Sequence, residues 1–250
     1  MRIAEKPGMR RLTTSLIAAV LIGFCSVSSA SAQQSLNLQI GGFVPAGSQP
    51  NGGPVINGRA DGDVLAADID FLDFRMSDFS GFTVNGEWLF AVTPNIEAGL
   101  GIGYYSHSVP SVYADAVNEN GTEIEQELKL RIAPFSATVR WLPIGNRATV
   151  VPYVGAGLGV FMWRYEETGQ FVDFRDNSIF SGSFSGSGAA TGPVILGGVR
   201  VPVGNWGIGG ELRYQHAVAD LPTDQGFAGE PVPRIDLGGF NILFSINVKF

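Results

Sequence analysis

The sequence has a single cysteine, few charged residues and no long unbroken apolar stretch. With Cys25 alone, a disulfide-stapled fold is excluded. Charged residues make up only 16 % of the chain and the mean hydropathy is +0.17, yet no apolar run reaches the length of a membrane-spanning helix. The 34 glycines in 250 residues are about twice the usual share of about 7 %, which disfavours helices. Apolar content without apolar runs indicates strands in which apolar and polar residues alternate.

The first 32 residues have the pattern of a secretory signal peptide. The basic stretch MRIAEKPGMRR is followed by the apolar LTTSLIAAVLIGFC and then by the small residues of SVSSASA. This order predicts cleavage after Ala32. We therefore expect a signal peptide over residues 1–32 and one β-barrel domain over residues 33–250. An uncleaved anchor and a lipoprotein signal at Cys25 are alternatives, disfavoured by the short apolar stretch and by the bulky Phe24.

Basic residues are scarce. The whole chain has 16 Lys and Arg against 23 Asp and Glu. Loss of the four basic residues and the one glutamate of residues 1–32 leaves 12 against 22, a formal charge of −10. Such an acidic chain does not attract nucleic acid non-specifically, so nucleic-acid binding is excluded as a function class.

Eight segments of the expected mature chain alternate between apolar and polar residues, which is the pattern of strands. They cover residues 35–46, 81–92, 96–107, 126–142, 150–165, 192–203, 206–216 and 235–250. In the fourth segment the apolar set changes from even positions, ending at Ile132, to odd positions, beginning at Phe135. Because a slip of one residue reverses every side chain, we predict a β-bulge at Ala133–Phe135, where Pro134 is tolerated.

The connections between these segments alternate in length. Residues 93–95, 143–148 and 204–205 are short, and Gly204 followed by Asn205 fits a two-residue hairpin turn. Four connections are long and rich in Gly, Asp, Asn, Ser and Pro, namely residues 47–78, 108–125, 165–191 and 218–234. Short periplasmic turns and long extracellular loops are typical of membrane barrels. The sequence therefore predicts an all-β fold, an eight-stranded antiparallel transmembrane up-and-down β-barrel with its polar face inward.

With the stretches PYVGAGLG and FSINVKF, this pattern resembles the eight-stranded outer-membrane β-barrel family of Gram-negative bacteria, of the OmpA/OmpX/OmpW-like kind. The resemblance covers residues 33–250 and implies location in the bacterial outer membrane. It also implies contact with outer-membrane lipid and lipopolysaccharide, and with the barrel-assembly machinery during biogenesis, which would read a last strand that ends in phenylalanine. The lipid-facing residues of this closing strand are Phe240, Ile242, Phe244, Ile246, Val248 and Phe250.

Aromatic and charged residues have expected places in such a barrel. Aromatic residues form a girdle at each membrane interface, here Trp88, Trp141 and Trp206 on the short-turn side and Tyr104 and Tyr214 on the other. Eight strands leave an interior just wide enough for side chains. The charged residues expected there are Glu87, Glu97, Lys129, Arg131, Arg140, Arg200, Glu211 and Arg213, with Arg200 nearly opposite Glu211. We interpret them as a static network, because an unpaired buried charge is costly; a gate in which pairs exchange partners is the alternative.

No residue pattern indicates a catalytic, cofactor or metal site. His107 and His216 lie at outer strand ends outside any enzyme motif, and the serines beside His107 point to the opposite face of the strand. The acidic residues in 61–78 and 115–127 can bind Ca²⁺ or stay solvated, but they do not match an EF-hand loop.

The long connection of residues 165–191 is rich in aromatic residues. Phe171, Phe174, Phe180 and Phe184 alternate there with Gly and Ser. In such a loop they can contact a partner or an extracellular ligand, plug the barrel mouth, or extend the strands above the membrane.

The sequence predicts a non-enzymatic outer-membrane barrel with a side-chain-filled interior and a structural or surface-interaction role. The alternative is an OmpW-like channel or carrier for small hydrophobic molecules, and a lipid-modifying enzyme is third. An apolar outer lumen would favour the carrier: the expected inward residues Leu89, Tyr105, Phe161 and Trp163 agree with one, whereas Lys129 and Arg131 do not.

Overall fold

The computed structural model describes residues 33–46, 55–56, 59–60, 63–173, 175–222, 224, 227 and 233–250. The expected signal peptide, residues 1–32, lies outside this part of the chain, as do Asp61 and Phe174. Residues 33–250 form one compact unit. No helix in the described part is long and apolar enough to span a membrane.

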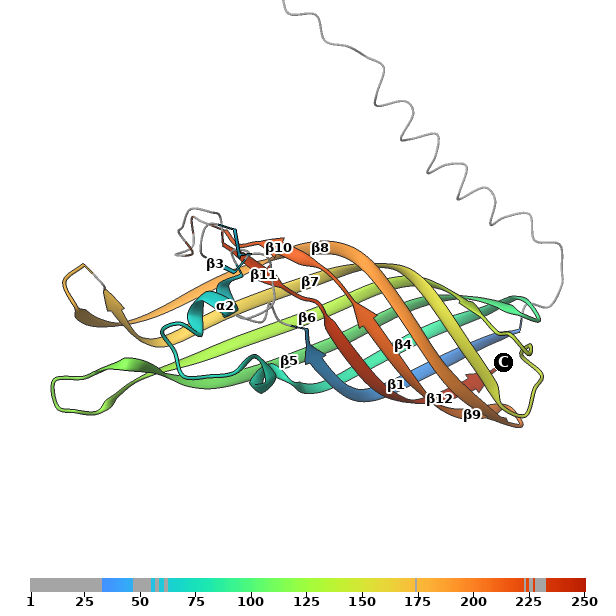
Figure 1. The fold of residues 1–250 in the computed structure, drawn as a ribbon. Coiled ribbons are helices and arrows are strands. Elements are labelled where there is room, and N and C mark those ends of the chain that lie inside the picture. Colours follow the sequence, from blue (N-terminus) through green and yellow to red (C-terminus); the bar gives the residue numbers. More distant parts are fainter. Residues whose placement is uncertain are drawn as a thin grey trace, which may run out of the picture. The chain divides into compact units, whose positions relative to one another are not determined.

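Eight antiparallel strands form a closed barrel in the order β1-β12-β9-β8-β7-β6-β5-β4 (Figure 1). Their bounds are β1 Gln34–Pro45, β4 Gly81–Thr93, β5 Ile96–Val117, β6 Glu123–Trp141, β7 Val151–Asp173, β8 Ser178–Val203, β9 Trp206–Gln215 and β12 Gly239–Lys249. The last strand pairs with the first from Ser35↔Lys249 to Pro45↔Gly239. The predicted eight-stranded barrel is confirmed.

Smaller elements come from the long connections between β1 and β4 and between β9 and β12. They are β2 Val55–Ile56, β3 Arg59–Ala60, α2 Val64–Asp68, the 3₁₀ helix η1 Met76–Phe79, β10 Val218–Asp220 and β11 Arg234–Asp236. The helix α2 begins at Asp63, whose side chain accepts a hydrogen bond from the backbone N–H of Leu65 at 3.2 Å. Strands β2 and β3 pair with each other, as do β10 and β11.

The turns at one end of the barrel are short, as predicted. Val203 pairs with Trp206, and Gly204 between them has φ +62°, a value that glycine adopts without strain. At the other end, two of the expected loops are mostly strand. Strands β7 and β8 stay paired up to Asp173↔Ser178, and β5 and β6 up to Val112↔Glu125, with a further pair beyond an irregularity. Residues 108–125 and 165–191 therefore form long β-hairpins. For residues 165–191 this confirms the alternative in which the strands are extended, whereas residues 108–125 were expected to be a loop.

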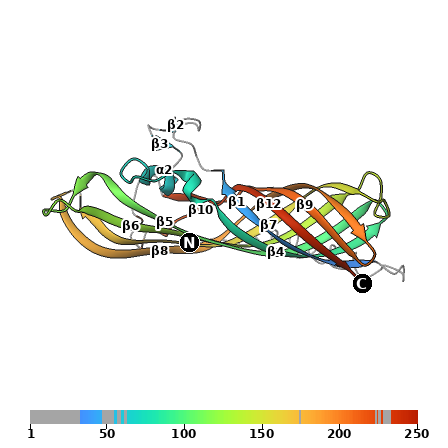
Figure 2. The same cartoon turned by 90° about the horizontal axis from the view of Figure 1, so that it is seen from below.

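The two hairpins extend β5, β6, β7 and β8 well beyond the other four barrel strands (Figure 2). We call this region the outer extension and define it as residues 106–117, 123–131, 164–173 and 178–187. Figures 1 and 2 show α2 and β10 on one side of it. We call the outer extension and these loop elements together the outer body.

The β-bulge predicted at Ala133–Phe135 does not exist. Strand β6 pairs with β7 residue for residue, without a register shift. Its even-numbered residues are buried on both sides of Pro134, from Leu128 and Ile132 to Arg140. The apolar residues change sides along β6 because the surroundings of the strand change, while the strand itself does not slip.

The outer surface of the barrel carries a continuous apolar belt. On β7 its five successive outward residues are Val154, Ala156, Leu158, Val160 and Met162. Leu158 at the middle of this row is 71 % exposed, and large apolar residues of the other barrel strands are similarly exposed. Five outward positions cover about nine or ten residues, the length of a transmembrane β-strand. Because a soluble surface does not carry so large an apolar patch, we assign this belt to lipid.

A separate apolar core fills the outer part of the lumen and continues into the outer body. It joins side chains of the outer extension and upper barrel to those of α2, η1 and the β10–β11 segment. Its larger members are Phe43, Leu65, Phe74, Phe79, Leu128, Leu130, Ile132, Phe161, Trp163, Tyr165, Phe227 and Ile235. The outer body is therefore packed like a soluble domain, with apolar side chains inside.

Candidate functional site

Four of the eight charged residues expected in the lumen meet inside the barrel. Arg140 Nη2 forms ion pairs with Glu87 and, at 2.9 Å, with Glu211 Oε2. Arg213 Nη2 lies 3.2 Å from Glu87 Oε2 and 2.7 Å from Glu211 Oε1. The four residues come from β4, β6 and β9, none of which is the neighbour of another in the barrel. The network therefore crosses the lumen instead of following its wall.

Polar neighbours complete this network. Thr138 Oγ1 donates to Glu87 Oε1 at 2.9 Å, and the hydroxyl of Tyr153 donates to Glu211 Oε2 at 3.0 Å. The guanidinium carbon of Arg140 lies 4.7 Å from the centre of the Tyr153 ring, within range of a cation–π contact. Two arginines and two glutamates balance in charge, which makes their burial tolerable.

Close packing around Glu87 depends on a glycine. A Cβ at Gly99 would lie 2.6 Å from Glu87 Oε1 and 2.7 Å from Thr138 Oγ1. Since real Cβ atoms do not approach so closely, the missing side chain makes room for the carboxylate. This is one reason why the inward face of β5 is rich in glycine.

A second ion pair lies in the lumen. Arg200 Nη2 is 2.7 Å from Glu97 Oε1, and both side chains are buried. Arg200 was expected nearly opposite Glu211, but its register partner on β9 is Gly209, and Glu211 lies opposite Gly198. Among the described residues, this pair adds a second buried ion-paired group to the lumen.

Lys129 and Arg131 are not in the lumen. Their neighbours Leu128, Leu130 and Ile132 point inward and are buried, so Lys129 and Arg131 point outward. Arg131 Nη2 pairs there with Glu166 Oε2 at 2.8 Å. Their expected inward position was wrong because it depended on the β-bulge, which does not exist.

The outer part of the lumen is apolar and occupied. Tyr105, Phe161 and Trp163 point inward, as expected, and pack in the apolar core. Leu89 is also buried. The hydroxyl of Tyr105 donates to the backbone oxygen of Phe79 in η1, which ties the loop after β1 to the barrel. Side chains of the chain itself fill this space.

Two carboxylates are placed together in the outer body, a feature that sequence reasoning missed. Tyr165, buried on β7, donates its hydroxyl proton to Asp68 Oδ2 at 3.1 Å. Burial and the nearby Glu167 carboxylate raise the pKa of Asp68 well above its usual value, and burial raises the pKa of Glu167 to about 7. Asp68 is nearly a hundred residues from Tyr165 along the chain, so no local pattern signals this contact.

The aromatic residues expected at the interfaces lie on the outer surface. Trp88 stacks on Phe90 with ring centres 5.6 Å apart, and its Nε1 donates to Gln34 Oε1 at 3.1 Å. Phe250 meets Trp88 edge-on at 6.3 Å, close to where the first and last strands join. At the other end of the closing strand, Tyr214 packs on Phe240 at 4.9 Å. Their roles as anchors, and that of Phe250 in assembly, stay predictions.

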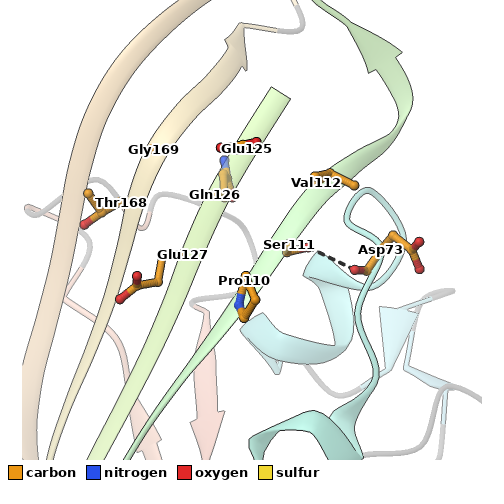
Figure 3. Close-up of a pocket in the computed structure, with 9 residues that line it drawn as sticks. All are labelled: Asp73, Pro110, Ser111, Val112, Glu125, Gln126, Glu127, Thr168 and Gly169. Carbon is orange, nitrogen blue, oxygen red and sulfur yellow. Dashed lines mark hydrogen bonds between the residues drawn. The ribbon is translucent and has the colours of Figure 1, made fainter. Parts of the chain in front are cut away.

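A pocket of about 520 Å³ opens on the outer extension. Its lining includes Asp73, Pro110, Ser111, Glu125, Glu127 and Thr168 (Figure 3). Ser111 Oγ donates to the backbone oxygen of Asp73 at 3.3 Å. In the described part of the chain, no three or more His, Cys, Asp or Glu residues are grouped to hold a metal ion.

Comparisons with known proteins concern the fold. No family model and no curated protein sequence matches the chain. Among solved structures, OprG from Pseudomonas aeruginosa aligns with a TM-score of 0.52 and 11 % identity, over 88 % of this chain and 96 % of OprG.

Two further solved structures align less well. Neisserial surface protein A has a TM-score of 0.45 and 12 % identity, over 89 % of this chain and 100 % of that protein. Outer membrane protein W of E. coli has a TM-score of 0.41 and 13 % identity, over 88 % of this chain and 100 % of that protein. The likeness to OprG establishes the fold of the eight-stranded outer-membrane β-barrels for residues 33–250, and the apolar belt agrees with location in the bacterial outer membrane.

Proposed function

We propose that this outer-membrane β-barrel is a non-enzymatic protein with a closed interior, which anchors the outer body at the cell surface in a structural or surface-interaction role. The observation that carries this proposal is the network of Glu87, Arg140, Glu211 and Arg213. It crosses the lumen between three non-adjacent strands, and Arg140 at its centre is only 1 % exposed.

The network is costly to open, because its four side chains hold one another in place. Each arginine contacts both glutamates, so withdrawing one side chain leaves two buried like charges that share a single opposite charge. An unpaired buried charge costs about 3–5 kcal/mol. This favours a static network over a gate in which pairs exchange partners.

The outer lumen supports the same proposal. It is apolar, which is the feature expected of a carrier for small hydrophobic molecules, and Lys129 and Arg131 do not interrupt it. However, the space is taken by the protein's own side chains, among them Phe79 from η1 against Tyr105 from β5. A hydrophobic cargo would have to displace a packed core, so the filled barrel is favoured.

The outer body is the part available for contacts with other molecules. Its outer sheet face is polar: Thr168 and Ser183 are register partners on β7 and β8, and their hydroxyls lie 3.1 Å apart. A folded, polar surface held above the membrane by a closed barrel suits a role in surface interaction.

Planar-bilayer recording of the purified protein tests closure. We expect no steady conductance steps from the protein. We expect steps from a variant that opens both filled parts of the lumen, in which Glu87→Ala/Arg140→Ala is combined with Phe161→Ala/Trp163→Ala. Arg131→Ala, on the outer face of the same strand, is the control and should stay silent. Steady, ion-selective steps from the unaltered protein would contradict a closed interior.

A further inference from the structure

Three cations lie together on the outer surface of β6 and β7. They are Lys129, Arg131 and Arg164. Arg131 and Arg164 are direct register partners, and Lys129 is the partner of Glu166. Among the other described cations on the surface, Arg175 pairs with Asp173 at a hairpin tip and Arg234 with Asp220. We call Lys129, Arg131 and Arg164 the basic cluster.

The basic cluster has surplus positive charge. Like charges directly opposite each other on a sheet are destabilising. Glu166 holds the two arginines in place: its Oε2 lies 2.8 Å from Arg131 Nη2 and its Oε1 lies 2.8 Å from Arg164 Nε. These four residues have a formal charge of +2 in a chain whose overall formal charge is −7. The next outward carboxylate on β6, Glu127, lies beyond Lys129 on the side away from the belt.

The basic cluster directly borders the apolar belt. On β6 the outward residues Phe135 and Ala133 are followed by Arg131, and on β7 the outward Met162 is followed by Arg164. On the next strand, the corresponding residue beyond the outward Tyr104 is an uncharged serine. Each arginine is therefore the first polar outward residue above the belt on its strand, at the level where lipid headgroups begin.

Both guanidinium groups have donors left for a ligand. A guanidinium carries five N–H donors, and in each arginine the contact with Glu166 engages one nitrogen. The side chains of Arg131 and Arg164 remain 37 % and 50 % exposed. The planar fork of N–H groups fits the oxygens of a phosphate group better than a point charge does.

We propose that Arg131, Arg164 and Lys129 bind the phosphate of a phosphorylated glycolipid in the outer leaflet, of the lipid A class. The acyl chains of this lipid lie against the belt below, beside Met162. The proposal rests on the orientation in which the outer extension faces outward. A local cationic site has a clear use here, because an acidic protein and an anionic leaflet otherwise repel each other.

Native mass spectrometry of the purified, folded protein tests this site. The probes are lipid A with its phosphates, dephosphorylated lipid A and inorganic phosphate. We expect the protein to prefer phosphorylated over dephosphorylated lipid A, and Arg131→Gln/Arg164→Gln to lose this preference. Affinity for the phosphorylated lipid should fall at least about tenfold, because the lost hydrogen bonds are charge-assisted.

The matched control is Arg175→Gln, which removes one cation from the same side of the protein and lies far from the belt at a hairpin tip. It should bind both lipids like the unaltered protein. Equal binding of the two lipids by the unaltered protein, or unchanged binding by the double variant, overturns the site. Inorganic phosphate bound as tightly as the lipid overturns the assignment to a lipid headgroup. None of these outcomes depends on whether the lumen conducts.

Discussion

The two halves of strand β6 show opposite arrangements of polar and apolar residues. In the membrane, Arg140 and Thr138 point into the lumen, and Val139 points to lipid. Above the membrane, Leu130 points inward and Arg131 outward. The backbone is continuous and its pairing with β7 has no register shift, so the strand geometry is the same in both halves.

The difference shows what an alternating pattern determines. Alternation assigns residues to two faces of a strand, but which face is the inner one depends on the medium outside. Lipid requires apolar side chains outward and leaves polar groups for the interior, where they must satisfy each other. Water reverses the preference. A change of phase within one strand can therefore mark the membrane boundary, and along β6 it lies at Ala133–Phe135.

The largest difference between the two halves of β6 is expected from two single variants, each of which removes one arginine. We expect Arg140→Met to lower the free energy of unfolding by about 3–5 kcal/mol, because Glu87 and Glu211 would share a buried site with one cation fewer. Arg131 lies nine residues from Arg140 on the outer face of β6. Arg131→Met should lower the free energy of unfolding by about 1 kcal/mol or less, the usual value of an exposed ion pair. Urea unfolding in lipid vesicles, followed by tryptophan fluorescence, measures both.

Equal losses for the two variants would contradict the comparison, since the outer ion pair would then be as important as the buried network. Vesicles of uncharged lipid keep the Arg131 result free of any contribution from a bound anionic lipid. Migration of the unheated protein on gels shows whether each variant forms a barrel before its stability is measured.

A smaller effect is expected from a new charge on the outward face of β7. Leu158→Arg, at the middle of the belt, should destabilise the folded barrel by about 2–4 kcal/mol because the guanidinium would lie in lipid. Thr168→Arg, on the same face in the outer extension, should change stability by less than about 0.5 kcal/mol. The same unfolding experiment compares the two variants. An unchanged free energy of unfolding for Leu158→Arg would show that Leu158 does not face lipid.

Much of the fold could be predicted from the sequence, because strand alternation and turn lengths are local signals. The eight strands, the turn at Gly204-Asn205 and the closing strand all depend on such signals. The β-bulge at Ala133–Phe135 was wrong for a physical reason: the pattern was interpreted as if one medium surrounded the whole strand. The hairpin of residues 108–125 was missed, and that of residues 165–191 was only one of three alternatives, because Gly and Ser residues such as Ser181 and Gly182 are typical of loops but lie in strands here.

The candidate site was predictable only in part. The inward placement of Glu87, Arg140, Glu211 and Arg213 follows from alternation within the belt, where the medium was assigned correctly. The ion pairs that these residues form do not follow from alternation, since contacts across a lumen depend on register and strand tilt around the barrel. The packing of α2 against β7 is also non-local, so the contact between Asp68 and Tyr165 has no sequence signal.

The smallest expected effect is a pH dependence confined to the outer body. Asp68 and Glu167 have folded-state pKa values above their usual ones, and that of Glu167 is about 7. Their contribution to stability is therefore complete below the unfolded pKa of about 4 and is lost as pH rises through the raised folded-state pKa values. Hydrogen exchange at α2, corrected for intrinsic rates, should therefore be faster at pH 8 than at pH 5, while the belt strands stay protected. Asp68→Asn/Glu167→Gln should abolish the difference, whereas Asp173→Asn should not, because Arg175 holds the pKa of Asp173 at about 2. A parallel change in the belt strands would show that the two halves do not respond separately.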